Sequence, residues 1–190
     1  MTALLVVSND DLAVILMADA GLRSGEVSGL RWCDIWWGRS KGDTSRHLHI
    51  CNNNPAGGGR NEAPESGRTR RVQLSQRLRA RLREGWLELG QPEIGYVAPG
   101  FDASNFAKRF SGLCRKAGIG SFRPKDLRST YASHLLSLGT PLTYIAAQLG
   151  HTSSETTRRH YARYIPAGYL APLPSRTAKS RLTCLLDSMR

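Results

Sequence analysis

Long apolar runs are absent from this sequence of 190 residues. No stretch of about 18 consecutive apolar residues occurs, which excludes a transmembrane helix. The first residues are apolar, but no basic segment precedes them. Asn9, Asp10 and Asp11 also interrupt the run, which is not typical of a signal peptide. These absences favour a protein of the cytoplasm.

Cysteine is scarce, and its copies lie far apart in the chain. They are Cys33, Cys51, Cys114 and Cys184. Because no Cys-x-x-Cys pair or Cys/His cluster occurs, the spacing predicts no metal site, and we interpret the cysteines as reduced thiols that mostly fill the core. His47 and His49 would share one face of a strand, and we interpret them as solvent-facing residues rather than ligands.

Motifs for nucleotide binding and for serine nucleophiles are also missing. The glycines at 57–59 are not followed by the Lys-Ser/Thr of a phosphate loop and do not lie between a strand and a helix. No Gly-x-Ser-x-Gly sequence is present. The sequence therefore predicts no bound cofactor.

Acidic residues are few beside basic ones. Lys and Arg together number 27 against 15 Asp and Glu, which gives a formal net charge of +12. Only five of the basic residues are Lys, so Arg dominates. A small domain this basic indicates a polyanionic partner, nucleic acid before a membrane, and Arg suits bidentate contacts to phosphate.

Helical periodicity dominates the chain. The predicted helices span 12–20, 24–32, 76–89, 104–118, 124–139, 141–150 and 154–164. Alternating segments at 46–51 and 69–74 predict paired antiparallel strands, and 95–100 predicts a further short strand. Ser75 is expected to cap its helix, and Pro124 suits a first helical turn. The predicted fold class is mainly α with a small antiparallel β-sheet (α+β).

Burial follows from the same patterns. Leu78, Leu82, Leu87 and Leu89 indicate a buried stripe on their helix. Tyr131 and Tyr144 lie inside apolar helices and are expected in the core. The segment 52–68 between the two strands is rich in Gly, Pro and Asn, and a loop this long inside a compact domain is usually functional.

Three separate segments hold residues suited to bind a phosphate. Arg23 sits on a turn directly before a helix, where backbone N–H groups favour an anion. Lys125 and Arg128 are three residues apart and share a helix face, so both can reach one phosphate. His151 follows a helix-ending glycine, and Tyr161 comes ten residues later. Each feature alone is typical of a solvated turn or face.

Taken in order, these segments resemble the tyrosine recombinase (phage integrase) family. The family pattern is an Arg in a Gly-Leu-Arg-x-x-Glu turn, a β-hairpin Lys, His-x-x-Arg, Leu-Gly-His and a nucleophilic Tyr. This sequence contains GLRSGE, PKDLR, LGH and TTRRHY in that order. The connecting sequences LRWCDI, RTRRVQLS and YVAP match as well. The resemblance covers about residues 9–165 and implies the catalytic-domain fold of tyrosine recombinases.

The resemblance implies a chemistry that these residues can support. The Tyr161 hydroxyl would attack a DNA phosphodiester and form a 3′-phosphotyrosyl link, which a free 5′-hydroxyl later reverses. Arg23 and Arg128 would bind the extra negative charge of the transition state, and His151 would donate a hydrogen bond to the same phosphate. Lys125 adds a further cation. The reaction needs no metal and no cofactor.

Two positions depart from the family pattern. Lys125 stands where His is usual in His-x-x-Arg. Glu65 stands where the alignment would place the hairpin Lys, with Arg60 and Arg68 as the nearest cations. The expected nucleophile is Tyr161, ten residues after the histidine, rather than Tyr164.

The expected organisation is one catalytic domain at 1–165 and a tail at 166–190, without the N-terminal core-binding domain of longer members. Leu182, Leu185, Leu186 and Met189 predict an amphipathic helix in the tail. The implied partners are double-stranded DNA and further copies of the chain, up to a tetramer on DNA, in the cytoplasm at the nucleoid.

Two other functions remain open at this point. One is a DNA-binding protein of the same fold whose catalysis is lost or weakened, which the two departures favour. The other is a basic RNA-binding protein. It explains the charge but not the order of the motifs.

Overall fold

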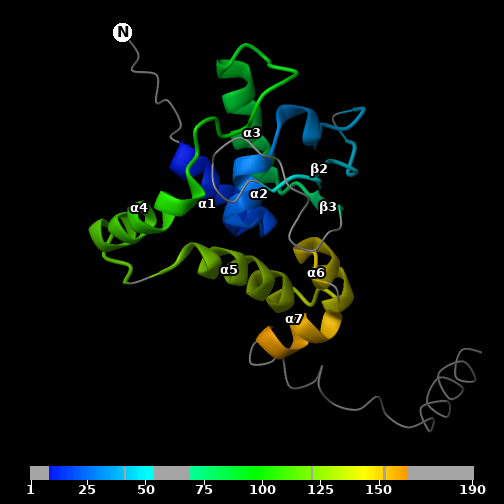
Figure 1. Ribbon diagram of the computed structural model, residues 1–190. Helices are drawn as coiled ribbons and strands as arrows, with labels where there is room; N and C mark the ends of the chain where they lie inside the picture. Colours follow the sequence, from blue (N-terminus) through cyan, green and yellow to red (C-terminus); the bar gives the residue numbers. More distant parts are fainter. Residues whose placement is uncertain (1–8, 41, 54–68, 121, 152, 162–190) are drawn as a thin grey trace, which may run out of the picture.

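The computed structural model describes residues 9–40, 42–53, 69–120, 122–151 and 153–161 (Figure 1). Helices surround a small sheet, which confirms the predicted class. The helices are α1 (Asn9–Ala20), α2 (Ser24–Gly29), α3 (Gln76–Glu88), α4 (Ala103–Lys116), α5 (Pro124–Ser137), α6 (Leu142–Leu149) and α7 (Ser154–Tyr161), with a short 3₁₀ turn, η1 (Trp32–Asp34). The strands are β1 (Ile35–Trp36), β2 (His47–Ile50) and β3 (Arg70–Gln73).

The three strands form one antiparallel sheet in the order β1-β2-β3. The predicted pair of strands is confirmed as β2 and β3, whereas β1 was not predicted. Leu48 lies opposite Ile35 on one side and Val72 on the other, and these three side chains are buried in the core. Because side chains alternate along a strand, the other face of the sheet turns outward and carries polar residues such as His49 and Arg71.

The buried side chains form two clusters. The larger one joins α1, α2, the sheet, α3 and α4, with fully buried Leu16, Leu48 and Phe106 among its members. The smaller one joins α5, α6 and α7. Helix α1 packs against α5 and α3, and α6 packs against α7 and β3, so these helices hold the two clusters together (Figure 1).

Local capping explains several helix boundaries. The Ser75 hydroxyl accepts a hydrogen bond from Leu78 N at 3.0 Å, which confirms the predicted N-cap of α3. Pro124 lies in the first turn of α5, as predicted. At the start of α7 the Ser153 hydroxyl accepts a hydrogen bond from Glu155 N at 3.1 Å. The predicted second helix starts as expected but ends at Gly29 rather than at residue 32.

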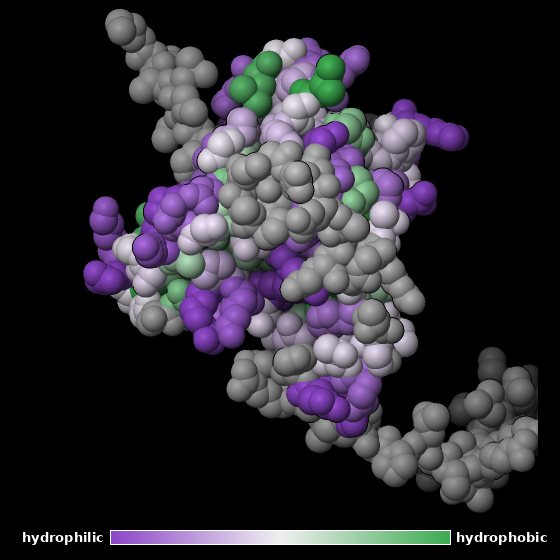
Figure 2. Space-filling view, viewed as in Figure 1, coloured by the Kyte–Doolittle hydropathy of each residue, from purple (hydrophilic) through white to green (hydrophobic). Residues whose placement is uncertain are grey.

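The predicted leucine stripe on α3 is only half right. Leu78 and Leu82 are fully buried, but Leu87 and Leu89 are 50% and 57% exposed. Leu87 lies five residues after Leu82, which rotates it by about 140° around the helix. Leu89 is the C-cap residue, beyond the last turn. Figure 2 shows hydrophobic surface near this upper end of α3.

Two further expectations are wrong. Residues 95–100 do not form a strand, because the contact of this segment with the chain before η1 is an isolated bridge between Arg31 and Tyr96. The backbone turns at Gly95, where φ is +107°, and this ends the pairing. Tyr144 is half-buried rather than in the core, and its hydroxyl donates to Gln73 Oε1 at 2.7 Å. Tyr131 is buried as expected.

The prediction for the cysteines holds for Cys114, which is buried, but it is wrong for the exposed Cys33. Cys51 is half-buried. The described helices are all too short or too polar to cross a lipid bilayer. The tail at 166–190 and residues 54–68 of the predicted loop lie outside the described part of the chain.

Candidate active site

The turn between α1 and α2 places Arg23. Gly21 ends α1 with φ at +63°, and a Cβ atom there would lie 2.6 Å from the Tyr131 ring, so only glycine fits. Arg23 is the N-cap residue of α2, and its backbone N–H donates to Glu26 Oε2 at 2.8 Å. Its guanidinium donates to Glu26 Oε1 at 3.2 Å and keeps a side-chain exposure of 29%. The side chain is thus both anchored and accessible.

Glu26 is the buried anion of the site, with an exposed fraction of 1%. Its two carboxylate oxygens accept two hydrogen bonds from the Arg70 guanidinium, both at 2.7 Å. Burial alone raises the pKa of Glu26, but the hydrogen bonds and charge of Arg70 and the Arg23 backbone N–H outweigh it, so the net pKa is lowered. Glu26 therefore stays ionised at neutral pH.

Arg70 connects this carboxylate to a distant helix. It lies in β3, and its Nε donates to the Gln148 carbonyl near the end of α6 at 2.8 Å. The Gln148 side chain in turn bonds the β3 backbone, accepting from Gln73 N and donating to Arg71 O. These contacts fix α6 against the sheet, and α6 leads directly to His151.

Arg128 lies in α5 where the two hydrophobic clusters meet. Its guanidinium donates to the Gly21 carbonyl and to the Leu149 carbonyl, and one nitrogen lies 4.0 Å from Glu26 Oε2. Burial and the nearby charge of Arg23 lower the pKa of Arg128 to about 10, so the side chain remains a cation at neutral pH. Arg23 and Arg128 therefore face the same carboxylate.

His151 follows the left-handed Gly150 that ends α6, with φ at +67°. Its backbone N–H donates to Ala146 O at 2.9 Å, which closes the turn. Its ring Nδ1 lies 2.8 Å from the hydroxyl of Thr157, a fully buried residue of α7. The contact links the histidine to the helix that carries Tyr161.

Tyr161 is the last residue of α7, with an exposed fraction of 7%. Its ring packs in the smaller cluster of buried residues with Tyr131 and Leu149. Arg128 reaches the same cluster, because its guanidinium donates to the Leu149 carbonyl. The structure thus brings Arg23 and Arg128 to the same carboxylate and connects His151 to α7, the helix that carries Tyr161.

Lys125 is the exception among the predicted residues. It lies one helical turn before Arg128, but its side chain is exposed. No hydrogen bond or ion pair joins its ammonium group to the other four predicted residues within the described part of the chain. The Arg123 backbone N–H and, to a smaller extent, the charge of Lys125 lower the pKa of Asp126. Glu65, Arg60, Arg68 and Tyr164 lie outside the described residues.

Sequence reasoning missed Arg70 as a member of the site. The signal was present in the strand pattern, because Arg70 and Val72 have the same parity in β3 and both are buried. An arginine at an inward position of a strand implies a buried acidic partner. The partner is Glu26, 44 residues earlier in the chain.

Comparison with known proteins shows which family the chain is part of. The sequence model of the phage integrase family matches residues 7–166 of this chain. The chain belongs to the phage integrase family. The matched range includes every described residue of the candidate site, from Arg23 to Tyr161, so the resemblance seen in the four motifs is confirmed.

Relatives within the phage integrase family include two curated recombinases. A tyrosine recombinase XerC-like protein of Caldanaerobacter subterraneus is 27% identical over 178 residues, covering 81% of this chain and 46% of the relative. Tyrosine recombinase XerD of Brucella suis is 32% identical over 107 residues, covering 50% of this chain and 34% of the relative. The chain spans less than half the length of these relatives.

The fold of this phage integrase family member is also seen in solved structures. One is the Tn1549 transposon integrase in complex with transposon right end DNA. It aligns with a TM-score of 0.66 at 14% identity, over 94% of this chain and 59% of that one. This likeness supports the described arrangement of helices around a small antiparallel sheet.

Proposed function

We propose that the chain is the catalytic part of a site-specific recombinase that breaks and rejoins double-stranded DNA through a 3′-phosphotyrosyl intermediate at Tyr161. The observation that carries the proposal is the convergence of Arg23 and Arg128 on Glu26, beside the buried cluster that contains Tyr161. These residues come from three separate segments of the chain. The Tn1549 integrase with its bound DNA supports DNA as the partner.

In the first step the Tyr161 oxygen forms a bond to the scissile phosphorus, and the bond to the 5′-oxygen of the next nucleotide breaks. The tyrosine loses its proton, and the leaving oxygen gains one. Arg23 and Arg128 stabilise the negative charge that grows on the non-bridging oxygens. His151 donates a hydrogen bond to the same phosphate. The exposed Lys125 adds positive charge at the rim of the site.

Glu26 and Arg70 act on this chemistry indirectly. The carboxylate accepts from both the backbone and the side chain of Arg23, which limits the positions that the guanidinium can take. Arg70 neutralises Glu26 and holds the end of α6, from which His151 extends. We also propose that copies of the chain assemble on DNA, up to a tetramer, and that the protein acts at the nucleoid.

The proposal is tested by trapping the covalent intermediate. The 190-residue protein is incubated with a pool of duplexes of random sequence, each nicked so that the cleaved strand end diffuses away. Adducts that survive denaturation are then counted. We expect adducts with the wild type and none with Tyr161→Phe, which loses only a hydroxyl and should bind the same DNA as tightly.

Two further variants complete the experiment. Tyr144→Phe is the matched control, because its hydroxyl contacts Gln73 outside the site, and it should form adducts as the wild type does. Tyr164→Phe should also form them. If Tyr161→Phe retains adducts and Tyr164→Phe loses them, the nucleophile is misassigned. DNA binding by the wild type without any adduct would favour the DNA-binding protein that has lost catalysis.

A further inference from the structure

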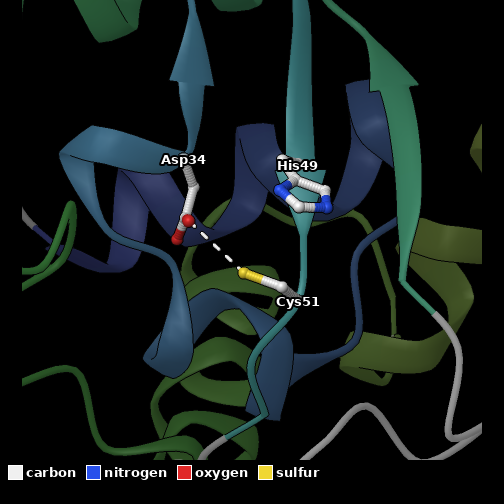
Figure 3. A group of neighbouring side chains, drawn as sticks. All are labelled: Asp34, His49 and Cys51. Carbon is white, nitrogen blue, oxygen red and sulfur yellow. Dashed lines mark hydrogen bonds between the residues drawn. The ribbon is translucent and has the colours of Figure 1, made fainter.

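The outward face of the sheet brings together an aspartate, a histidine and a cysteine. In the antiparallel register, Ile35 of β1 pairs with Leu48 of β2. Asp34 precedes Ile35 and His49 follows Leu48, so the same register continued by one residue carries Asp34 toward His49. Cys51 follows two residues after His49 and therefore points to the same side of the strand. Figure 3 shows the three side chains gathered on one side of the ribbon, with Asp34 beside β1 and the other two along β2.

The potential ligand atoms of these three residues are close together. A carboxylate oxygen of Asp34, a ring nitrogen of His49 and the Cys51 sulfur all lie within 4.8 Å of one another. The Cys51 thiol donates to Asp34 Oδ1 at 3.3 Å. The other carboxylate oxygen, Oδ2, accepts from the Arg31 backbone N–H at 2.9 Å. This second bond orients the carboxylate so that Oδ1 faces the cluster.

We propose that Asp34, His49 and Cys51 bind one zinc ion on the outward face of the sheet. Zinc takes oxygen, nitrogen and sulfur ligands in a tetrahedron, with bonds of about 2.0–2.3 Å. Atoms held within 4.8 Å of one another can reach such an ion through small side-chain rotations. A water molecule would supply the fourth ligand. Thiolate and imidazole ligands favour zinc over magnesium or calcium, which prefer oxygen alone.

The proton balance of binding follows from the thiol. Without a metal the sulfur carries the proton that it donates to Asp34 Oδ1. When zinc binds, the sulfur–hydrogen bond is replaced by a sulfur–zinc bond, and the proton passes to solvent. Carboxylate and thiolate together then balance the two charges of the ion. No redox step is involved.

The site would tie together two parts of the chain that the sheet joins weakly. Strand β1 has only two residues, and Asp34 lies directly before it. Cys51 lies directly after β2, and it follows Asp34 by 17 residues. A metal bond across this gap would hold η1 and β1 on the end of β2. Binding to the folded state alone would therefore raise the thermal unfolding temperature.

The experiment titrates the metal-free 190-residue protein with cobalt(II), a zinc substitute whose bond to a thiolate gives a charge-transfer absorption band. We expect the band to saturate at one cobalt per chain and to disappear when zinc is added. Cys51→Ser should abolish the band. His49→Gln and Asp34→Asn should each weaken zinc binding by more than the roughly 10–100-fold that loss of an outer-shell partner costs.

Matched controls separate this site from the other cysteines and histidines. Cys33→Ser removes an exposed neighbouring thiol, and His47→Gln removes the other histidine of β2, whose Nδ1 donates to Ser45 O. Both should retain the band and the zinc affinity. Zinc should raise the unfolding temperature of the wild type and both controls, but not that of His49→Gln, whose exposed side chain can be replaced without unfolding the sheet.

Three results would overturn the proposal. One is a wild type without a cobalt–thiolate band. Another is a band that persists in Cys51→Ser, which would place the metal on a different cysteine. The last is a Cys33→Ser variant that loses the band as fully as Cys51→Ser, which would exclude the assignment to Asp34, His49 and Cys51 alone.

Discussion

At the scale of single residues, Glu26 organises the charges of the candidate site. Its carboxylate contacts the guanidinium groups of Arg23 and Arg70 directly and lies 4.0 Å from that of Arg128. Arg70 is itself almost fully buried, so the pair is shielded from water. Removing one partner of such a pair leaves the other charge buried without compensation.

We expect Glu26→Gln to lower the free energy of unfolding by about 3–5 kcal/mol, because the Arg70 charge is left in the interior. Denaturant unfolding at pH 7 measures the change. Glu155→Gln is the matched control, since Glu155 forms an exposed pair with Arg158 on α7, and it should leave stability unchanged. An equally small effect of Glu26→Gln would mean that water reaches Arg70.

The same carboxylate gives a pH dependence with a definite sign. Because the net pKa of Glu26 is lowered in the folded state, its ionised form stabilises the fold above the unfolded-state pKa, about 4.3. That stabilisation is lost as the pH falls through the folded-state value. Wild-type stability should therefore decrease below about pH 4.3 more steeply than that of Glu26→Gln. Parallel curves for the two proteins would contradict this assignment.

At the scale of elements, the end of α6 joins the sheet to the candidate site. Gly150 has φ at +67°, which lets the chain turn from α6 toward His151. A Cβ atom on Gly150 would lie 3.0 Å from Arg70 Cδ and 3.1 Å from its Nη1. A side chain at this position would thus be strained by the backbone and would also displace the arginine that binds Glu26.

We expect Gly150→Ala to destabilise the protein by more than the roughly 1–2 kcal/mol that a left-handed conformation costs an alanine. Gly118→Ala is a matched control, because Gly118 also has φ at +67° but has open space where the Cβ would go. The difference in unfolding free energy between the two variants measures the crowding of Arg70. Equal losses would show that Arg70 moves aside without cost.

At the scale of the whole molecule, positive charge dominates. The net charge is +12. Figure 2 shows hydrophilic residues at several places on the face it presents. Proteins that neutralise DNA phosphates release bound counterions, so their affinity falls with salt. If the chain binds DNA as proposed, contacts to many phosphates should make this salt dependence strong.

We expect the logarithm of the DNA association constant to fall linearly with the logarithm of salt concentration, by roughly 0.9 for each phosphate contacted on duplex DNA. Fluorescence anisotropy with a labelled duplex measures the slope. A single strand gives roughly 0.7 for each phosphate and serves as the comparison. A slope near zero on both would contradict a nucleic-acid partner.

Features that depend on near neighbours in the chain were predictable from the sequence. The N-cap at Ser75 and Pro124 in the first turn of α5 follow from a local hydrogen bond and local backbone geometry. The order of the four motifs was also sufficient to indicate the family. On that basis Arg23 and Arg128 could be predicted to bind the same phosphate, although they lie 105 residues apart in the chain.

Features that depend on distant contacts became visible in the folded chain alone. Strand β1 has two residues, too few for a periodic signal, and it forms because β2 lies beside it. Arg70 is buried because Glu26 arrives from α2, and Lys125 stays exposed although the motif placed it with the other predicted residues. Asp34, His49 and Cys51 meet through strand pairing, which no spacing along the chain reveals. The physical reason is that local bonds fix the elements, whereas packing between elements fixes which side chains meet.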